Sequence, residues 1–508
     1  MNGPPRLTPA QARWTLVVTI LASSVAFIDM TIVNLALPVM QLDMGSSFRS
    51  MQWVVEAYVL LLTALMLTGG GLADAFGRRR ILCVGAVVFA VASISAGLAS
   101  SAETLIAARA LQGAGGALLA PASLAIVSSS FPPGERGRAL GLWAAFSAVS
   151  TAIAPPLGGV LIEFWSWRAV FFVNVPILAL VLFIASRQVP ESFDHERGTS
   201  IDLWGALTAI GSLGLLTFAL LRAGESGLND PLVVACLVAA MAFAAAFVSA
   251  EQRAKSPMLP LSMFRSRRFT GLNLMTLVLF TAVGGVMFFL PMTLIQSLGY
   301  SALQAGAAMV PSMLVMFVLS PQIGRFVDRF GPKLPLTIGP LLSAVSYVVF
   351  ANTTEAAYVD GMLVPIVLMG IGFGTWVTPL TSAFMSAAGD ERAGVASGIN
   401  NAVARLAQLL AIAILGLLAA MAFNAALDIR LLAAGVPSEA IESLADERIK
   451  LGAMRAPAAF PAELRDALSR AVAASFREAF ACVAYASAGL CIAASAIGYW
   501  SVRRLPSR

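Results

Sequence analysis

Residues 14–38, WTLVVTILASSVAFIDMTIVNLALP, are apolar almost throughout and carry a single charged side chain, Asp29. A helix needs about 20 mostly apolar residues to cross the hydrocarbon core of a bilayer, and this stretch has that length. It is too long for the apolar region of a secretory signal and lacks a clear small-residue cleavage site. We therefore expect a permanent transmembrane span, and it must be helical because backbone polar groups in lipid need partners within the segment.

Stretches of this kind recur along the whole chain. Of its 508 residues, 58% are hydrophobic and 12% charged, about half the charged fraction of a soluble protein. The sequence therefore predicts an all-α polytopic membrane protein with about fourteen transmembrane helices. The expected spans are 14–38, 52–73, 81–99, 104–128, 138–162, 169–187, 202–222, 230–250, 269–296, 303–324, 333–352, 360–386, 394–421 and 478–501.

The distribution of lysine and arginine predicts the orientation. If the N-terminus lies inside, the inner segments hold 21 of these residues and the outer loops only Arg49, Arg168 and Arg222, leaving out the long loop 422–477. Cytoplasmic loops carry such an excess, so both termini are expected in the cytoplasm. The formal charge of +6 is spread over short loops, which does not indicate a nucleic-acid partner. We interpret 422–477 as an extracytoplasmic cap.

Two inner loops repeat one pattern, and this repeat indicates a duplicated architecture. Residues 70–80 read GGLADAFGRRR and residues 324–333 read GRFVDRFGPK, with their aspartates 328 − 74 = 254 residues apart. This spacing predicts two six-helix halves, 1–190 and 263–508, around an inserted helix pair, 191–262, as in transporters with internal repeats. We expect a conformational latch on the cytoplasmic side that holds the outward-facing state. Its residues would be Gly70, Asp74, Gly77, Arg78, Arg79, Gly324, Asp328, Arg329 and Gly331.

Charges at membrane depth are costly and mark functional sites. The helix rise places Asp29, Glu56 and Arg109 at similar depth in the outer half of the bilayer. Arg109 would neutralise one carboxylate, leaving the other able to take up and release a proton. We expect Asp29 to be the main proton site because it lies deeper. Glu56 is either a second proton site, a determinant for cationic substrates, or an interfacial residue, and a purely structural Asp29–Arg109 pair is the alternative for those two.

Several segments, in order along nearly the whole chain, resemble the major facilitator superfamily and its fourteen-span drug:proton antiporter branch. They are FIDMTIVNLALP (27–38), QWVVEAYVL (52–60), 70–80, RALQGAGG (109–116), WSWRAVFFVNVP (165–176) and SGINNAVAR (397–405). Gly141, Pro155, Gly158 and Gly159 match the pattern linked to antiporters in the fifth span, whereas Ser150 and Ala154 stand where the family usually has Gly. In the first latch loop Ala75 stands where the family often has Arg, which predicts a weaker latch than the second, where Arg329 is present.

Further polar and aromatic residues complete the expected site. Gln112 lies on the same closely packed face as Arg109, and Arg405 is interpreted as a structural or gating residue bonded to polar groups of the second half, with Asn400 and Asn401 a turn away. An apolar wall would suit hydrophobic cations. Its candidates are Phe27, Tyr58, Trp143, Phe146, Phe280, Phe288 and Trp376.

The resemblance thus implies a proton-coupled exporter of hydrophobic, mainly cationic, compounds in a bacterial inner membrane. The partners expected are small hydrophobic substrates, protons and lipids, and the protein is expected to act as a monomer. Four cysteines in apolar runs, one histidine (His195) and no nucleotide loop predict no metal, no cofactor and no enzyme. The alternatives are export of an endogenous metabolite or lipid, solute:proton symport, or a non-transporting receptor.

Overall fold

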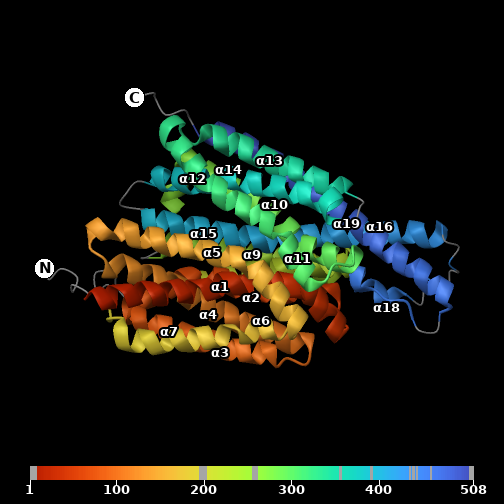
Figure 1. Cartoon of the computed structure of the whole chain (residues 1–508), viewed down its shortest axis with the longest axis horizontal. Helices are drawn as coiled ribbons and strands as arrows, with labels where there is room; N and C mark the ends of the chain where they lie inside the picture. Colours follow the sequence, from red (N-terminus) through yellow and green to blue (C-terminus); the bar gives the residue numbers. More distant parts are fainter. Residues whose placement is uncertain are drawn as a thin grey trace. The chain divides into compact units, whose positions relative to one another are not determined.

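The computed structural model describes residues 8–193, 203–254, 261–353, 357–388, 393–433, 436, 441, 444–457 and 460–502. Within these ranges the chain is built from helices and contains no strand, which confirms the predicted all-α class (Figure 1). The first helices are α1 (Pro9–Met44), α2 (Phe48–Phe76), α3 (Arg78–Gly97), α4 (Ala102–Ser130), α5 (Pro133–Phe164), α6 (Ala169–Phe172), α7 (Asn174–Gln188), α8 (Leu203–Ser226) and α9 (Pro231–Arg253).

The remaining helices continue from residue 261, and three of them are single π-helical turns, η2, η3 and η5. They are η1 (Leu261–Arg265), α10 (Arg267–Met292), η2 (Thr293–Ser297), α11 (Ala302–Ala308), α12 (Val310–Phe330), α13 (Lys333–Asn352), η3 (Tyr358–Met362), α14 (Leu363–Ala388), α15 (Ala393–Leu410), η5 (Ala411–Leu415), α16 (Gly416–Ala433), α18 (Ala445–Arg448), η6 (Leu451–Ala453) and α19 (Ala462–Ser501).

Twelve helices in the described part of the chain are long and apolar enough to cross a membrane. A thirteenth is α2, if its segments Phe48–Met66 and Thr68–Phe76, which meet at 52°, count as one span. The predicted span 138–162 lies within α5, where the apolar stretch found is the shorter Val149–Phe164. The many-spanning class is therefore confirmed, and the count of fourteen stays a prediction.

The chain forms two compact units, and the end of α1 and the start of α2 group with the C-terminal residues. The first unit contains Met1–Ala36, Trp53–Leu215 and Val238–Leu259, and the second contains Leu37–Gln52, Leu216–Leu237 and Pro260–Arg508. The division along the sequence at residues 190 and 262 stays a prediction.

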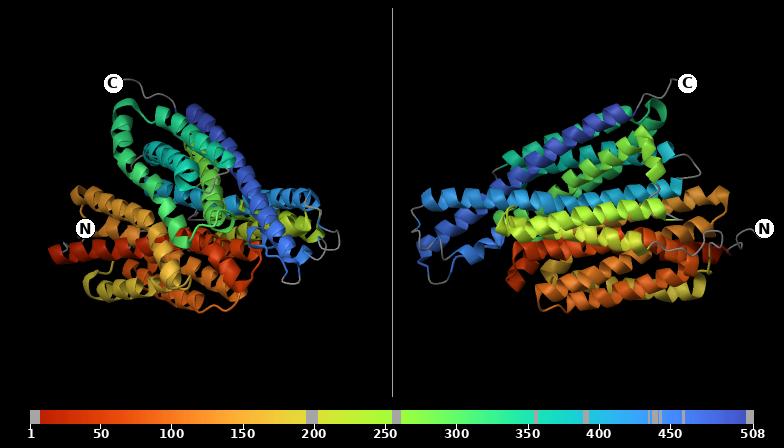
Figure 2. Two further views of the ribbon diagram at one scale, coloured as in Figure 1. Left: turned by 45° about the vertical axis from the view of Figure 1, so that its right-hand side comes forward. Right: turned by 180° about the vertical axis from the view of Figure 1, so that it is seen from behind.

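The packing inside each unit follows the same order. In the first unit α3 packs against α4 and α7, and in the second α13 packs against α14 and α19. If spans 1–6 correspond to spans 9–14, these are equivalent pairs. The two views of Figure 2 show α13 alongside α19 over much of its length. This shared order supports an internal duplication.

The two latch loops have the same backbone conformation. Gly77 and Gly331 each have a positive φ, 107° and 81°, which a residue with a Cβ rarely adopts. Each N–H closes the preceding helix, Gly77 onto the Ala73 carbonyl at 3.1 Å and Gly331 onto the Val327 carbonyl at 2.8 Å. The last glycine of each repeated pattern is thus explained by a helix-ending turn.

The helices α15, η5 and α16 follow one another without a break from Ala393 to Ala433, and α19 begins at Ala462. The predicted last span, 478–501, lies inside α19, and this helix begins 478 − 462 = 16 residues before the span. Hydropathy marks only the apolar part of a helix, and α19 continues beyond it in a polar segment that packs against α16. Part of the predicted cap 422–477 is thus an extension of two transmembrane helices.

The segment after α18 contacts the end of α1 and the start of α2, all within the second unit. The Phe48 N–H donates to the Ile449 carbonyl at 2.8 Å, and Gln41 Nε2 donates to the Lys450 carbonyl at 2.9 Å. The next residue, Leu451, begins η6; it is buried and has a φ of 49°, the one positive value found for a non-glycine in the described residues.

Close contact between α2 and α4 depends on Gly113. A Cβ at this position would overlap the backbone carbonyl of Tyr58. Because backbone cannot swing aside as a side chain can, a larger residue must push the two helices apart. This contact sets the distance across which Arg109 of α4 reaches α2.

We expect Gly113→Val to destabilise the protein by about 1–3 kcal/mol, the usual cost of overpacking. Thermal unfolding of the detergent-purified protein measures this loss. The matched control is Gly141→Val in α5, where a Cβ would meet nothing within 4 Å. Equal melting temperatures for the two variants would contradict the close approach.

Candidate functional site

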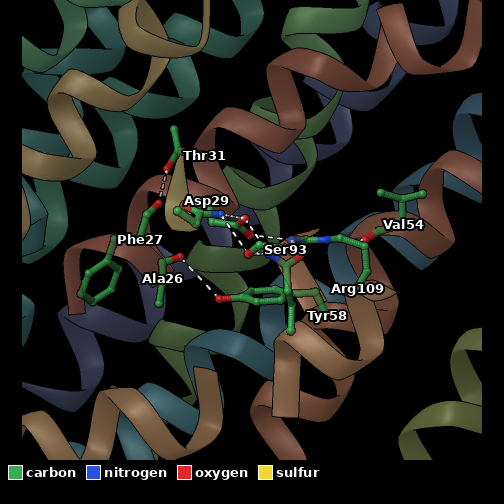
Figure 3. Close-up of polar contacts among 10 residues, drawn as sticks. Ala26, Phe27, Asp29, Thr31, Val54, Tyr58, Ser93 and Arg109 are labelled. Atoms are coloured by element: carbon green, nitrogen blue, oxygen red, sulfur yellow. Dashed lines mark hydrogen bonds and ion pairs between the residues drawn. The ribbon is translucent and has the colours of Figure 1, made fainter. Parts of the chain in front are cut away.

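An ion pair between Asp29 of α1 and Arg109 of α4 lies at the centre of the first unit. Arg109 Nη1 donates to Asp29 Oδ2, and both side chains are fully buried (Figure 3). Charges buried in a protein need a partner and further hydrogen bonds, because removal from water costs several kcal/mol per ion. Hydrogen bonds from the surrounding groups are therefore needed to offset the cost of burying these two charges.

Amide and hydroxyl groups from three helices surround the other oxygen of Asp29. Gln112 Nε2 donates to Asp29 Oδ1 at 3.2 Å, and Asn174 Nδ2 donates to the same atom at 2.9 Å. Ser93 Oγ accepts from Gln112 Nε2 at 2.8 Å and from Asn174 Nδ2 at 3.4 Å. Both Asp29 oxygens thus accept hydrogen bonds, within a network that joins helices α1, α3, α4 and α7.

The Arg109 guanidinium is fixed by α2 as well. Its Nε donates to the Val54 carbonyl at 3.0 Å, Nη1 donates to Gln112 Oε1 at 2.7 Å, and its Cζ lies 4.3 Å from the centre of the Tyr58 ring. Val54 and Tyr58 are four residues apart on α2 and so share one face. Figure 3 shows the arginine extended between Asp29 and Val54, with Tyr58 beside it.

Glu56 is not part of this network. It is fully buried, and neither carboxylate oxygen has a hydrogen-bond partner among the described residues. Glu56 lies between Val54 and Tyr58 in sequence, and two residues correspond to about 200° around a helix. Its side chain therefore points away from the face that contacts Arg109. Of the three charges expected at one site, the structure brings together Asp29 and Arg109.

The first latch loop carries a local ion pair. Arg78 donates to Asp74 Oδ1 through Nε at 2.9 Å and Nη2 at 2.8 Å, with both side chains largely buried. Glu191, after α7, accepts from the backbone N–H groups of Arg79 at 2.9 Å and Arg80 at 3.2 Å. A carboxylate in this position satisfies the free N–H groups at the start of α3 and opposes the helix dipole.

The second latch loop differs in its charges. Asp328 has no ion pair within the described ranges, and the Arg329 guanidinium lies 5.1 Å from the Phe330 ring centre. A Cβ on Gly324 would lie 4.0 Å from Thr378 Cγ2, and a Cβ on Gly70 would lie 3.6 Å from Pro121 Cβ. The expectation that the first loop is the weaker latch stays a prediction, and the partner of Asp74 is Arg78, one turn later, and not residue 75.

The small residues of α5 place that helix against α1. A Cβ on Gly158 would lie 2.9 Å from Ile32, Ser150 Oγ donates to Ser24 Oγ at 2.7 Å, and Pro155 is buried inside the helix. Gly159 is also buried, whereas Gly141 is exposed. Pro155, Gly158 and Gly159 therefore lie in packed parts of α5. Ser150 stands where the family usually has Gly, and its hydroxyl forms the interhelical hydrogen bond to Ser24.

A family profile described as Major Facilitator Superfamily matches residues 19–412, which include this network and both latch loops. The chain belongs to the Major Facilitator Superfamily. This membership makes it an integral membrane transporter and not an enzyme.

Relatives of this superfamily member carry names of drug resistance and export. The multidrug resistance protein Stp of Mycobacterium tuberculosis is 34% identical over 82% of this chain and 77% of its own. The tetracenomycin C resistance and export protein of Streptomyces glaucescens is 32% identical over 97% and 92%. The puromycin resistance protein pur8 of Streptomyces alboniger is 36% identical over 79% and 80%.

Solved transporter structures share the fold of this superfamily member. A bacterial homologue of the human lysosomal transporter Spinster has a TM-score of 0.65 and 15% identity, covering 98% of this chain and 100% of that chain. The POT family transporter PepTSo has a TM-score of 0.66 and 12% identity, covering 97% and 98%.

The second unit of this superfamily member contains Arg405, which is half-buried and donates from Nη1 to Gln408 Oε1 at 3.1 Å. Asn400 Oδ1 accepts from Thr276 Oγ1 at 2.9 Å, and Asn401 is exposed. Arg405 thus contacts a polar group of its own helix, and Asn400 links α15 to α10.

The aromatic candidates for the substrate wall differ in their burial and in their contacts. Tyr58 is fully buried against Arg109, and Phe288 is buried among Phe48 and Phe289. Trp376 is buried beside Phe280 and donates to Ser343 Oγ at 3.2 Å. Trp143 donates to Ser23 Oγ at 3.1 Å, Phe27 is half-buried and Phe146 is exposed. Their role as a substrate wall stays a prediction.

A cavity of about 270 Å³ lies inside the second unit and is lined by none of these aromatic candidates. Its walls come from the start of α2, from α8, from α16 and from the cap, and include the ion pair between Arg49 and Glu225. The cavity wall thus combines this charged pair with apolar side chains, among them Leu221, Leu417 and Leu451.

Sequence reasoning missed three polar residues of these sites: Asn174, Ser93 and Glu191. Asn174 had a signal, because it is a polar residue inside the WSWRAVFFVNVP stretch. Glu191 gave no distinct signal, because Asp194 and Glu196 follow it in the same segment. Ser93 has no sequence signal, since a single serine in an apolar helix is common.

Proposed function

We propose that this protein exports hydrophobic, mainly cationic, compounds in exchange for protons across a bacterial inner membrane, with both termini in the cytoplasm. The observation that carries the proposal is the buried Asp29–Arg109 pair, set among amides in the core of a superfamily member. The resistance and export names of its relatives support efflux as the direction and small molecules as the cargo.

Protonation of Asp29 is the step that changes the charge of the core. In the ionised form, Asp29 balances Arg109 and accepts from Gln112 and Asn174. A proton on Asp29 removes this balance and leaves Arg109 as an uncompensated cation. Such a charge favours release of a cationic substrate by repulsion. Loss of the proton towards the cytoplasm restores the pair and allows the next substrate to bind.

Glu56 is proposed as a second proton or cation site. A buried carboxylate without a hydrogen-bond partner is more stable in its neutral, protonated form than as an anion. It would lose its proton when a substrate cation arrives to compensate the charge. The Asp29 and Glu56 carboxyls would then carry out different steps, one paired with Arg109 and the other with substrate.

The Asp74–Arg78 pair is proposed to work as the cytoplasmic latch of the outward-facing state. We expect Asp74→Asn to slow transport several-fold and to shift the population toward the inward-facing state, because the pair loses its charge. Distances between spin labels on the two cytoplasmic loops report the population. Asp328→Asn is the control, since Asp328 has no ion pair in the described part of the chain. An unchanged rate together with an unchanged population for Asp74→Asn would exclude the latch.

Export of a compound made by the cell itself is a second candidate. The relative that covers 97% of this chain is named for resistance to and export of tetracenomycin C. The compound panel for the test must therefore include uncharged aromatic natural products beside lipophilic cations.

The proposal is tested by proton release from the purified protein. Addition of a transported compound should release protons into a weakly buffered solution, and Asp29→Asn should abolish the release. Glu56→Gln, measured in parallel, shows which carboxyl contributes. Binding of panel compounds to the wild-type protein without any proton release would contradict proton-coupled exchange.

A further inference from the structure

Asn174 contacts the carboxyl group of Asp29 but is not needed to pair its charge. It is the first residue of α7, follows the break after α6, and is fully buried. Its Nδ2 donates to Asp29 Oδ1, while its own Oδ1 is buried and has no partner among the described residues. A buried amide oxygen without a hydrogen-bond donor is energetically unfavourable, so the free Asn174 Oδ1 needs an explanation.

The reason follows from the two protonation states of Asp29. An ionised carboxylate accepts hydrogen bonds only, whereas a protonated one carries an O–H that needs an acceptor. Among the described groups bonded to Asp29, Gln112 already uses its Oε1 to accept from Arg109 at 2.7 Å. Ser93 Oγ already accepts from both amides. The free acceptor next to the carboxyl is Asn174 Oδ1.

We propose that Asn174 serves both states of Asp29 by turning its amide. With Asp29 ionised, Nδ2 donates to the carboxylate, as observed. After protonation, a half-turn about the last side-chain bond presents Oδ1, which accepts the new O–H. Asn and Gln amides are near-symmetric in shape, so this exchange needs no extra space. Asn174 is a positioning residue for the proton, and this role rests on the proposed proton uptake by Asp29.

The charged and titratable groups around this carboxyl are few. Arg109 approaches Oδ2 from α4, and the Tyr58 ring from α2 lies against the guanidinium. Glu56 points to the other side of α2. The O–H of a protonated Asp29 would therefore be directed toward α3 and α7, where Ser93 and Asn174 lie, and not toward the cation.

The test is infrared difference spectroscopy of the full-length protein between high and low pH. Asp29→Asn identifies the carbonyl band of protonated Asp29, because this band disappears in the variant. We expect Asn174→Leu to move the band to higher frequency, as the O–H loses its acceptor, and to slow substrate-driven proton release about tenfold, the effect of one hydrogen bond at a charged group. Gln112→Leu is the matched control, since it removes a second amide donor to the same oxygen but no free acceptor, and its band should stay in place.

The possible failures are distinguishable. If the spectrum lacks a band that depends on Asp29, Asp29 does not take up a proton and the proposed function fails with the inference. If the band exists and Asn174→Leu leaves it in place, or if Gln112→Leu moves it equally, Asn174 has only a structural role. Asn174→Ala is measured alongside so that the outcome does not depend on whether the larger leucine is tolerated.

Discussion

Asp29→Asn is expected to abolish uphill efflux while leaving the protein folded. Asn has the size of a protonated Asp and keeps hydrogen-bonding groups for Gln112 and Asn174. It resembles the proton-loaded state and cannot leave it. An exchanger of one proton for one monovalent cation sustains about a tenfold substrate gradient per pH unit, since a tenfold ratio corresponds to about 1.4 kcal/mol. In proteoliposomes with a pH difference of one unit, the variant should therefore give a ratio near one.

The control is substrate exchange without a pH difference. This exchange needs alternating access but no net proton movement. It is measured with an uncharged compound, which the unpaired Arg109 does not repel, so Asp29→Asn should retain part of it if the fold is intact. Glu56→Gln is the matched carboxyl, buried in the same unit but outside the Arg109 network. Normal accumulation by Asp29→Asn, with loss only in Glu56→Gln, would transfer the main proton site to Glu56.

Arg109→Met should cause the largest loss of stability among these substitutions. The change removes the partner of a fully buried anion, together with hydrogen bonds to Val54 and Gln112. Breaking a buried ion pair by removing one partner typically costs about 3–5 kcal/mol. The measurement is thermal or denaturant unfolding of the purified protein, with Arg405→Met as the control, because Arg405 is only half-buried.

A double variant separates charge from packing. Asp29→Asn combined with Arg109→Met removes both charges, so it should be more stable than Arg109→Met alone, as expected for a coupled pair. It should still fail to accumulate substrate. Additive losses of stability in the double variant would show that the two side chains do not interact in the folded protein.

The apolar spans were predictable because a bilayer imposes a single simple requirement on the chain. About 20 apolar residues per helix are needed, whatever the neighbouring helices are. The same signal does not mark the start of α19, whose first part is polar and which begins 478 − 462 = 16 residues before the predicted apolar span. Packing against α16 stabilises that part, and packing between distant segments does not appear in a hydropathy profile.

The candidate site was predictable in its charges but not in its partners. Asp29 and Arg109 are costly at membrane depth, so each indicates a site without knowledge of the other. Glu56 gave the same signal, yet the helix directs it away from Arg109. Depth along a helix can be counted from the sequence, whereas the direction of a side chain relative to other helices depends on how those helices pack.

The sequence by itself determined that this protein is a many-helix membrane protein with a few charges inside it, and it predicted a duplicated architecture. Apolar length, loop charge and the repeated glycine–aspartate loops are local properties, and each has its effect whatever the rest of the chain does. Only the tertiary structure decided that Asp29 pairs with Arg109, that Asn174 and Ser93 complete the network, and that Glu56 is left without a partner. Hydrogen bonds extend over about 3 Å, so helices distant in sequence must first pack before their polar groups can select one another.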